Sequence, residues 1–133
     1  TIKMKAREFV EIVKETIMDT AQKITKYNYY LDYNEKDLDN NNILIEFLEE
    51  YIYDNNFLPT RAGDIQLEKS IGGTEGKGSY VQRVFSVYDE KTKEKEYFAC
   101  EGYYSSWVGV EYDGYDFVKV KPQEEIVINY VPE

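Results

Sequence analysis

Two stretches in the first half of the chain place apolar residues at the spacing of an amphipathic helix. In residues 1–27 apolar side chains recur three or four positions apart and share one stripe: Phe9, Val10, Val13, Ile17, Ala21 and Ile24. Residues 43–53 repeat this pattern, and the polar run 37–42 before them is typical of a loop. We therefore expect two helices, with Asn41 or Asn42 as the N-cap of the second.

After Pro59 the apolar positions alternate, which is the period of β-strands. Strands are predicted around Ile65 and Leu67 and over residues 80–88, 96–104, 107–112, 117–121 and 125–131. Asp113-Gly114 is a two-residue hairpin signal that would pair residues 107–112 with 117–121. The expected fold class is α+β: two N-terminal helices followed by a mostly antiparallel sheet of about five strands. The length suits a single domain over 1–133, with a helical part at 1–58 and a β-sheet part at 59–133.

Acidic residues outnumber basic ones by 26 to 16, which gives the chain a net charge of −10. The excess of acid lies entirely after residue 35, because the first part of the chain is balanced. Such a surface repels phosphate backbones and attracts basic proteins, so we expect a basic partner and no direct binding of nucleic acid. The alternative is that the acidity serves only solubility.

The sequence contains no recognisable set of catalytic or metal-binding residues. Histidine, the usual general base, is absent, and Cys100 lies in an apolar alternating stretch where a buried thiol is expected. Residues 72–78 are rich in glycine, but a strand rather than a helix is predicted after them, so we interpret them as a turn and not as a phosphate site. Residues 37–41 resemble the start of a calcium loop, yet Leu48 stands where that loop requires glutamate. We expect no enzyme activity, no cofactor and no metal.

The sequence also bears on where the protein acts. No run of about 18 apolar residues predicts a transmembrane helix, and no secretion signal is visible. The single cysteine, Cys100, excludes an internal disulfide and fits a reducing compartment. A cytoplasmic protein that does not bind membranes is expected, and its oligomeric state stays open.

Residues 97–119 concentrate aromatic and acidic side chains, a pattern that favours a protein-binding surface. Tyr103 and Tyr115 are the better surface candidates, whereas Trp107 fits a core position and an interface equally well. Acidic residues on the polar face of the second helix would extend this surface. The residues expected to bind a partner protein are Glu46, Glu49, Glu50, Asp54, Tyr103, Tyr104, Trp107, Glu111, Asp113, Tyr115 and Asp116.

A series of short motifs in the second half of the chain forms a recurrent pattern. They are Gly72-Gly73 with Gly76 and Gly78, Val84-Phe85, Gly102-Tyr103-Tyr104-Ser105-Ser106, Gly109, Glu111, Val120-x-Pro122 and Tyr130. In these motifs the chain resembles a family of small uncharacterised phage and prophage proteins. The resemblance implies a phage protein that acts in the cytoplasm of its bacterial host. Many small acidic phage proteins inhibit host defence enzymes, including CRISPR effectors, so an anti-defence role is implied by class.

Three functions remain open after these observations. The first is an acidic phage-type inhibitor that binds a basic host defence protein, such as a CRISPR nuclease, and blocks its nucleic-acid site. The alternative is a structural or accessory phage protein that self-associates through its sheet. The third is carbohydrate binding through the aromatic strands.

Overall fold

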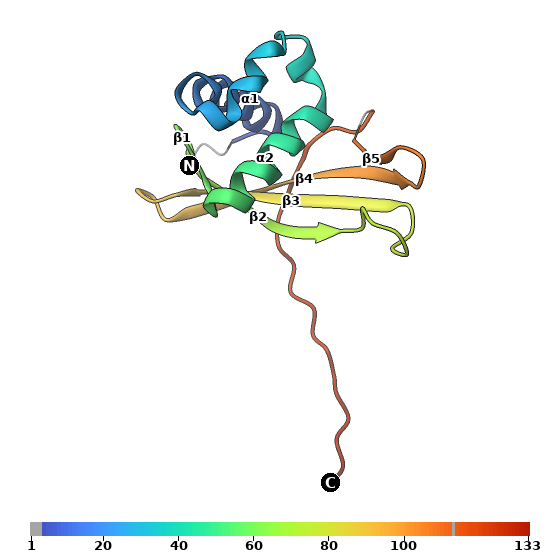
Figure 1. Ribbon diagram of the computed structural model, residues 1–133. Helices are drawn as coiled ribbons and strands as arrows, with labels where there is room; N and C mark the ends of the chain where they lie inside the picture. Colours follow the sequence, from blue (N-terminus) through green and yellow to red (C-terminus); the bar gives the residue numbers. More distant parts are fainter. Residues whose placement is uncertain (1–3, 113) are drawn as a thin grey trace.

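Helices lie on only one face of an antiparallel sheet in the computed structural model, which describes residues 4–112 and 114–133 (Figure 1). The helices and strands are, in chain order, α1 (Ala6–Lys23), η1 (Thr25–Asp32), η2 (Asp37–Asp39), α2 (Asn41–Asn55), β1 (Leu58–Thr60), β2 (Gly63–Ile71), β3 (Tyr80–Asp89), β4 (Glu94–Ser105), β5 (Gly109–Glu111) and β6 (Val118–Val120). The predicted α+β class, with helices ahead of an antiparallel sheet, is confirmed.

The first helix follows its apolar stripe but is shorter than predicted. Phe9, Val13 and Ile17 are fully buried, as the spacing requires. The helix begins at Ala6 and ends at Lys23, because Ile24 adopts an extended conformation. The expectation that residues 24–27 continue the helix was therefore wrong.

A 3₁₀-helix that the sequence pattern did not predict follows directly. In η1, Tyr27 and Tyr30 are buried and pack against Phe47 of α2, with ring centroids 5.9 and 5.2 Å apart. These long-range contacts, rather than a local repeat, explain why this segment is ordered.

The second helix is capped one residue earlier than expected. The side-chain oxygen of Asn40, not of Asn41 or Asn42, accepts a hydrogen bond from the Asn42 amide at 2.8 Å. Asn41 and Asn42 instead reach across to the segment after β5. The Asn42 side-chain oxygen accepts from the Tyr112 amide at 2.6 Å, and the Asn41 amide group donates to the carbonyl of Tyr115.

The sheet runs in the order β1-β2-β3-β4-β5, and β6 also pairs with β4. On the edge of β4 away from β3, β5 pairs with residues 103–105 and β6 pairs with residues 97–99. The predicted hairpin between residues 107–112 and 117–121 was therefore wrong, because both segments pair with β4 instead of with each other. Asp113 lies outside the described residues, while the Tyr115 amide donates to the Tyr112 carbonyl at 3.1 Å across this turn.

The predicted last strand, residues 125–131, was also wrong. After β6 the chain has no helix or strand, and it runs away from the sheet on the side opposite the helices (Figure 1). Its apolar side chains are exposed to solvent. The sequence pattern is that of a strand, but no strand of this chain pairs with the segment among the residues that the structure describes.

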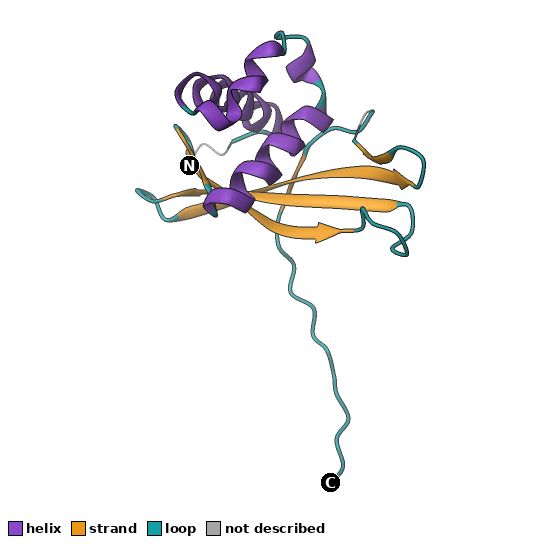
Figure 2. Cartoon of the chain, in the orientation of Figure 1, coloured by secondary structure: helices purple, strands orange, loops and turns teal. Residues whose placement is uncertain are grey.

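The core lies between the helices and the inner face of the sheet. Phe9 of α1 stacks on Phe98 of β4, with ring centroids 4.6 Å apart, and Phe117 packs beside them. Val81, Phe85 and the other inward residues of β3 continue this layer. The outer face of the sheet has no helix over it (Figure 2). The sheet therefore displays one complete face to its surroundings.

Candidate protein-binding surface

The turn between β4 and β5 carries the most exposed aromatic side chain of the predicted binding residues. β4 continues to Ser105 and β5 starts at Gly109, so Trp107 stands at the tip of a tight hairpin, where it is 96% exposed. The choice between core and interface that the sequence left open for Trp107 is thereby decided in favour of the surface. An exposed tryptophan on a hydrogen-bonded hairpin is typical of a contact residue.

A row of side chains on the outer face of the sheet leads away from this hairpin. Tyr103 of β4 pairs with Tyr80 of β3 on one side and with Glu111 of β5 on the other. Because paired residues share a face, these three side chains lie next to one another. Tyr103 is 53% exposed, which agrees with its prediction as a surface residue. Tyr80 was not predicted to bind a partner, and it lies beside Tyr103 because the register of β3 and β4 pairs the two residues.

Tyr104 has a different role from its neighbour. It lies on the inner side of β4, and its hydroxyl donates to Glu75 at 2.9 Å. Its backbone amide also donates to the Ser79 carbonyl at 2.8 Å. The hydrogen bond to Glu75 raises the pKa of Tyr104 above its ordinary value. Tyr104 thus holds the glycine-rich loop against the end of β4.

The glycine-rich residues 72–78 form a connection between β2 and β3, as predicted. The loop is followed by a strand, so it offers no helix N-terminus for a phosphate group. Gly72 has a φ of +70°, and a Cβ atom there would lie 2.1 Å from the carbonyl oxygen of Tyr80. Glycine at this position is therefore required by the close approach of two backbones.

Tyr115 and Asp116 lie beyond β5, on the side of the sheet that the helices cover. Tyr115 is 41% exposed, and its carbonyl is held by Asn41 of α2. Asp116 is exposed and borders an open depression of about 610 Å³ that Tyr115 and residues of α1 also line. These two residues are therefore at the surface, as predicted, but on a different face from Tyr103 and Glu111.

The acidic residues of α2 are more occupied than the sequence suggested. Glu46 is exposed. Glu50 accepts hydrogen bonds from the hydroxyls of Tyr29 and Tyr30. Asp54 accepts from Lys26 at 2.6 Å and from Tyr27 at 2.8 Å, and these two contacts lower the pKa of Asp54. The carboxylates of Glu50 and Asp54 therefore hold η1 against α2.

Glu49 also has a partner inside the chain, and that partner is a residue the sequence reasoning missed. Arg83 points inward from β3 and is 8% exposed. Its Nε donates to Glu49 at 3.1 Å, and its other nitrogens donate to the carbonyls of Ile71, Gln82 and Gly72. The sequence did contain a signal for this position. Arg83 lies two residues from Val81 and two residues from Phe85, so in a strand it shares their face and points toward the core.

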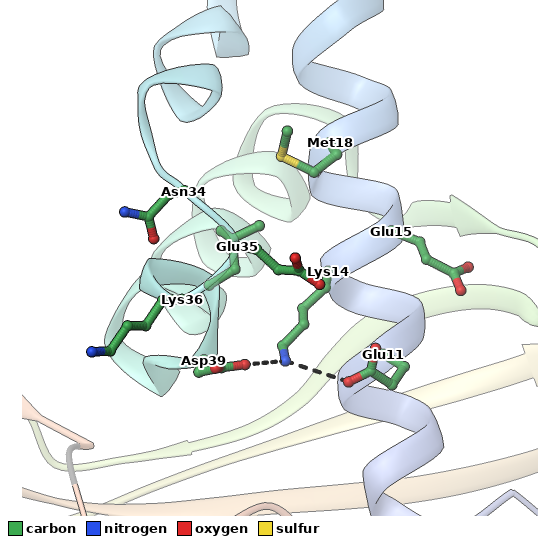
Figure 3. A pocket seen from close by; sticks show the side chains of 9 residues that line it. Glu11, Lys14, Glu15, Met18, Asn34, Glu35, Lys36 and Asp39 are labelled. Carbon is green, nitrogen blue, oxygen red and sulfur yellow. Dashed lines mark hydrogen bonds and ion pairs between the residues drawn. The ribbon is translucent and has the colours of Figure 1, made fainter.

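An open depression of about 900 Å³ lies between α1 and the loop before η2 (Figure 3). Figure 3 shows Lys14 reaching from α1 to the carboxylates of Asp39 and Glu11. The Lys14 Nζ lies 3.3 Å from Oε1 of Glu11. The hydrogen bond to Asp39 is the main cause that raises the pKa of Lys14. A lysine held in its charged form is a poor general base, so this depression offers no catalytic group of that kind.

Cys100 is the one cysteine of the chain. The thiol of Cys100 is fully buried, and burial together with Asp116 and Glu101 raises the pKa of Cys100 to about 12. A thiol with so high a pKa is a weak nucleophile at neutral pH. Within residues 4–112 and 114–133, no group of three or more acidic or cysteine side chains is arranged to hold a metal ion. No helix in that part of the chain is long and apolar enough to cross a membrane.

Comparisons with protein-family models, curated proteins and solved structures gave no match for this chain. The resemblance to small phage proteins therefore stays an expectation from the sequence motifs. Any functional conclusion has to come from the surface itself.

Proposed function

We propose that the protein is a non-catalytic binding protein that contacts a basic partner protein through the β4–β5 hairpin and the adjoining row on the outer face. The observation that carries this proposal is the 96% exposure of Trp107 at the tip of the hairpin. Truncating a tryptophan anchor at a protein interface costs about 2 kcal/mol or more, which corresponds to about 30-fold in affinity. Tyr103 and Tyr80 supply further aromatic contact area beside it.

The charge around the hairpin supports a basic partner. Glu111 lies beside Tyr103, and Glu101 lies near Tyr80 on the same outer face. The pKa of Tyr80 is raised first by partial burial of the ring and second by the negative charge of Glu101. Carboxylates beside exposed aromatic rings suit the lysine and arginine side chains of a partner, since the rings can also contact cations through their faces.

The narrower form of the proposal rests on the motifs shared with phage proteins. In that form the partner is a host defence protein with a basic nucleic-acid site, such as a CRISPR nuclease, and binding would block that site. The negative charge of the chain would then substitute for the charge of a phosphate backbone. A nucleic acid that binds the same partner should compete with the protein for it.

Affinity capture with matched variants tests the broader proposal. Bacterial lysate is passed over the immobilised protein, over Trp107→Ala, and over the control Tyr53→Ala, which removes another exposed aromatic ring at the far end of α2. We expect a basic protein that is retained by the wild type and by Tyr53→Ala, lost with Trp107→Ala, and released as salt rises to about 0.5 M. Equal retention by Trp107→Ala and the wild type would exclude this surface as the binding site.

A second candidate function, self-association through the sheet in a structural or accessory phage protein, is favoured by one observation. The outer face of the sheet carries no second layer of structure in the described part of the chain (Figure 2).

A further inference from the structure

The segment of residues 126–131 has the composition of a strand but no place in a sheet. It combines β-branched residues with one tyrosine, which are the residue types that favour strands. Ile126 is 94% exposed and Tyr130 is 93% exposed, and Val127, Ile128 and Val131 are also exposed. A short, uncharged run of such residues is unstable in water unless it pairs with another surface.

The outer face of the sheet offers the kind of surface that this segment lacks. Pairing registers place Val84 of β3, Tyr97 of β4 and Val120 of β6 on this face. All three are partly exposed, and the helices cover only the opposite face (Figure 2). Sheets in stable domains are normally covered on each apolar face by a second layer.

A groove lies on this face at the point where the chain leaves the sheet. It has a volume of about 460 Å³, and Val84, Tyr97 and Val120 line it together with Lys69. Residues 121–123 form one of its walls, so the groove adjoins the stretch of chain that leads to this segment.

The charges on the groove and on the segment are complementary. Lys69 and Lys121 line the groove together with Glu68, whose carboxylate pairs with Lys95 at 3.0 Å, whereas Glu124 and Glu125 precede the apolar run. Lys69 takes part in no ion pair among residues 4–112 and 114–133. The groove can therefore accept an acidic, apolar strand.

We propose that residues 126–131 of one copy lie in the outer-face groove of a second copy, so that two chains exchange these segments. Within one chain the segment would have to reverse direction over residues 121–125. The structure shows no such reversal, since the chain after β6 runs away from the sheet on the side opposite the helices (Figure 1). Exchange between two copies requires no reversal, and a two-fold axis makes the same contact twice. The interface is separate from the Trp107 hairpin.

The first test joins cysteines placed in different copies. Ile128→Cys and Val84→Cys are made in separate chains that differ in mass, mixed, and oxidised mildly. We expect a disulfide-linked pair containing one chain of each kind. Cys100 does not interfere because it is buried. The matched control replaces Val84→Cys by Tyr53→Cys, which is more accessible than position 84 but lies on α2, and we expect it to give no linked pair with Ile128→Cys.

The second test measures oligomeric state by sizing with light scattering over a concentration series. We expect a dimer, and Ile128→Asp should raise the dissociation constant of this dimer by at least about tenfold. The near-ultraviolet circular dichroism, which reports the packing of the aromatic core, should stay unchanged. Trp107→Ala should leave the dimer intact, so this proposal and the proposed function can fail separately. A monomeric wild type, a linkage formed within single chains carrying both cysteines, or linkage only between two Ile128→Cys chains would each overturn the proposal.

Discussion

Arg83 is the residue whose removal should most clearly separate buried from surface ion pairs in this protein. It is the one buried basic side chain among the described residues, and it joins β3 to α2 and to the end of β2. We consider Arg83→Met, which keeps most of the length of the side chain and removes its charge and its donors. The packing of the aliphatic part should therefore be largely retained.

The magnitude follows from the contacts that are lost. Arg83 donates to Ile71 and Gln82 at 3.0 Å each, to Gly72 at 3.2 Å and to Glu49 at 3.1 Å. Hydrogen bonds from a charged donor contribute about 1.5–3 kcal/mol each at most. The sum overstates the loss, because the Glu49 side chain is 39% exposed and water can replace its partner. We expect a decrease in the free energy of unfolding of about 2–4 kcal/mol.

Denaturant unfolding followed by circular dichroism measures this change, and the melting temperature should fall by roughly 6–15 °C. The matched control is Arg61→Met, since Arg61 also pairs with a carboxylate but on the surface, where it donates two hydrogen bonds to Glu15. That control should leave the free energy of unfolding nearly unchanged, because solvent screens an exposed ion pair. Glu49→Gln should cost about 1 kcal/mol, and the double variant should show coupling between the two sites. If Arg83→Met and Arg61→Met destabilise equally, the buried network is not what stabilises this end of the sheet.

Three further predictions concern single residues. Burial and a hydrogen bond to Asp54 raise the pKa of Tyr27 to about 12, so its contribution to stability should be intact below about pH 10 and fall between pH 10 and about 12. Alkaline denaturation curves measure this fall, and Tyr27→Phe should lessen it. Cys100, buried and with its pKa raised to about 12, should react with a thiol reagent only after unfolding in denaturant, and fast labelling of the native protein would contradict its burial. Gly72→Ala should destabilise the protein by about 2–4 kcal/mol, because its Cβ would lie 2.1 Å from the Tyr80 carbonyl oxygen. Gly76→Ala should cost about 1 kcal/mol, because no atom lies within 4 Å of its added Cβ, and thermal melts of the two variants measure the difference.

The elements that the sequence predicted well are those whose signal is local. The stripe containing Phe9 and Val13 defined α1, and the alternation around Phe85 and Phe98 defined the central strands. In each case the burial seen in the structure repeats the period of the pattern. A helix or strand that covers one face of a core needs no information beyond its own period.

The elements that the sequence missed depend on distant partners. Tyr27 and Tyr30 are ordered because Phe47 and the carboxylates of Glu50 and Asp54 lie beside them, about twenty or more residues away. The hydrogen-bond partners of Glu50 and Asp54 lie in η1, far from α2 along the chain, so the sequence showed only two carboxylates on a polar helix face. A carboxylate on a polar helix face reads as solvated unless the position of its partner is known.

The candidate binding surface was predicted in part for the same reason. Tyr103 and Glu111 lie together because the register of β4 and β5 pairs them, and this register is set by the turn at Trp107. The sequence indicated the residues but not the turn, since it placed the hairpin at Asp113-Gly114 instead. Tyr115 and Asp116 were expected on the same binding surface as Tyr103, whereas they lie beyond β5 on the other face of the sheet.

The segment of residues 126–131 shows the limit of alternation as a signal. Alternation predicts that a segment will be extended and will have an apolar side, but it contains no information on which edge or face receives it. Within this chain the edge of β4 is already occupied by β5 and β6, and α1 and α2 occupy the inner face. The outer face, which carries Val84, Tyr97 and Val120, is not covered in this way. In the proposed exchange this segment is extended, as its alternation predicts, and the face that receives it belongs to a second copy of the chain.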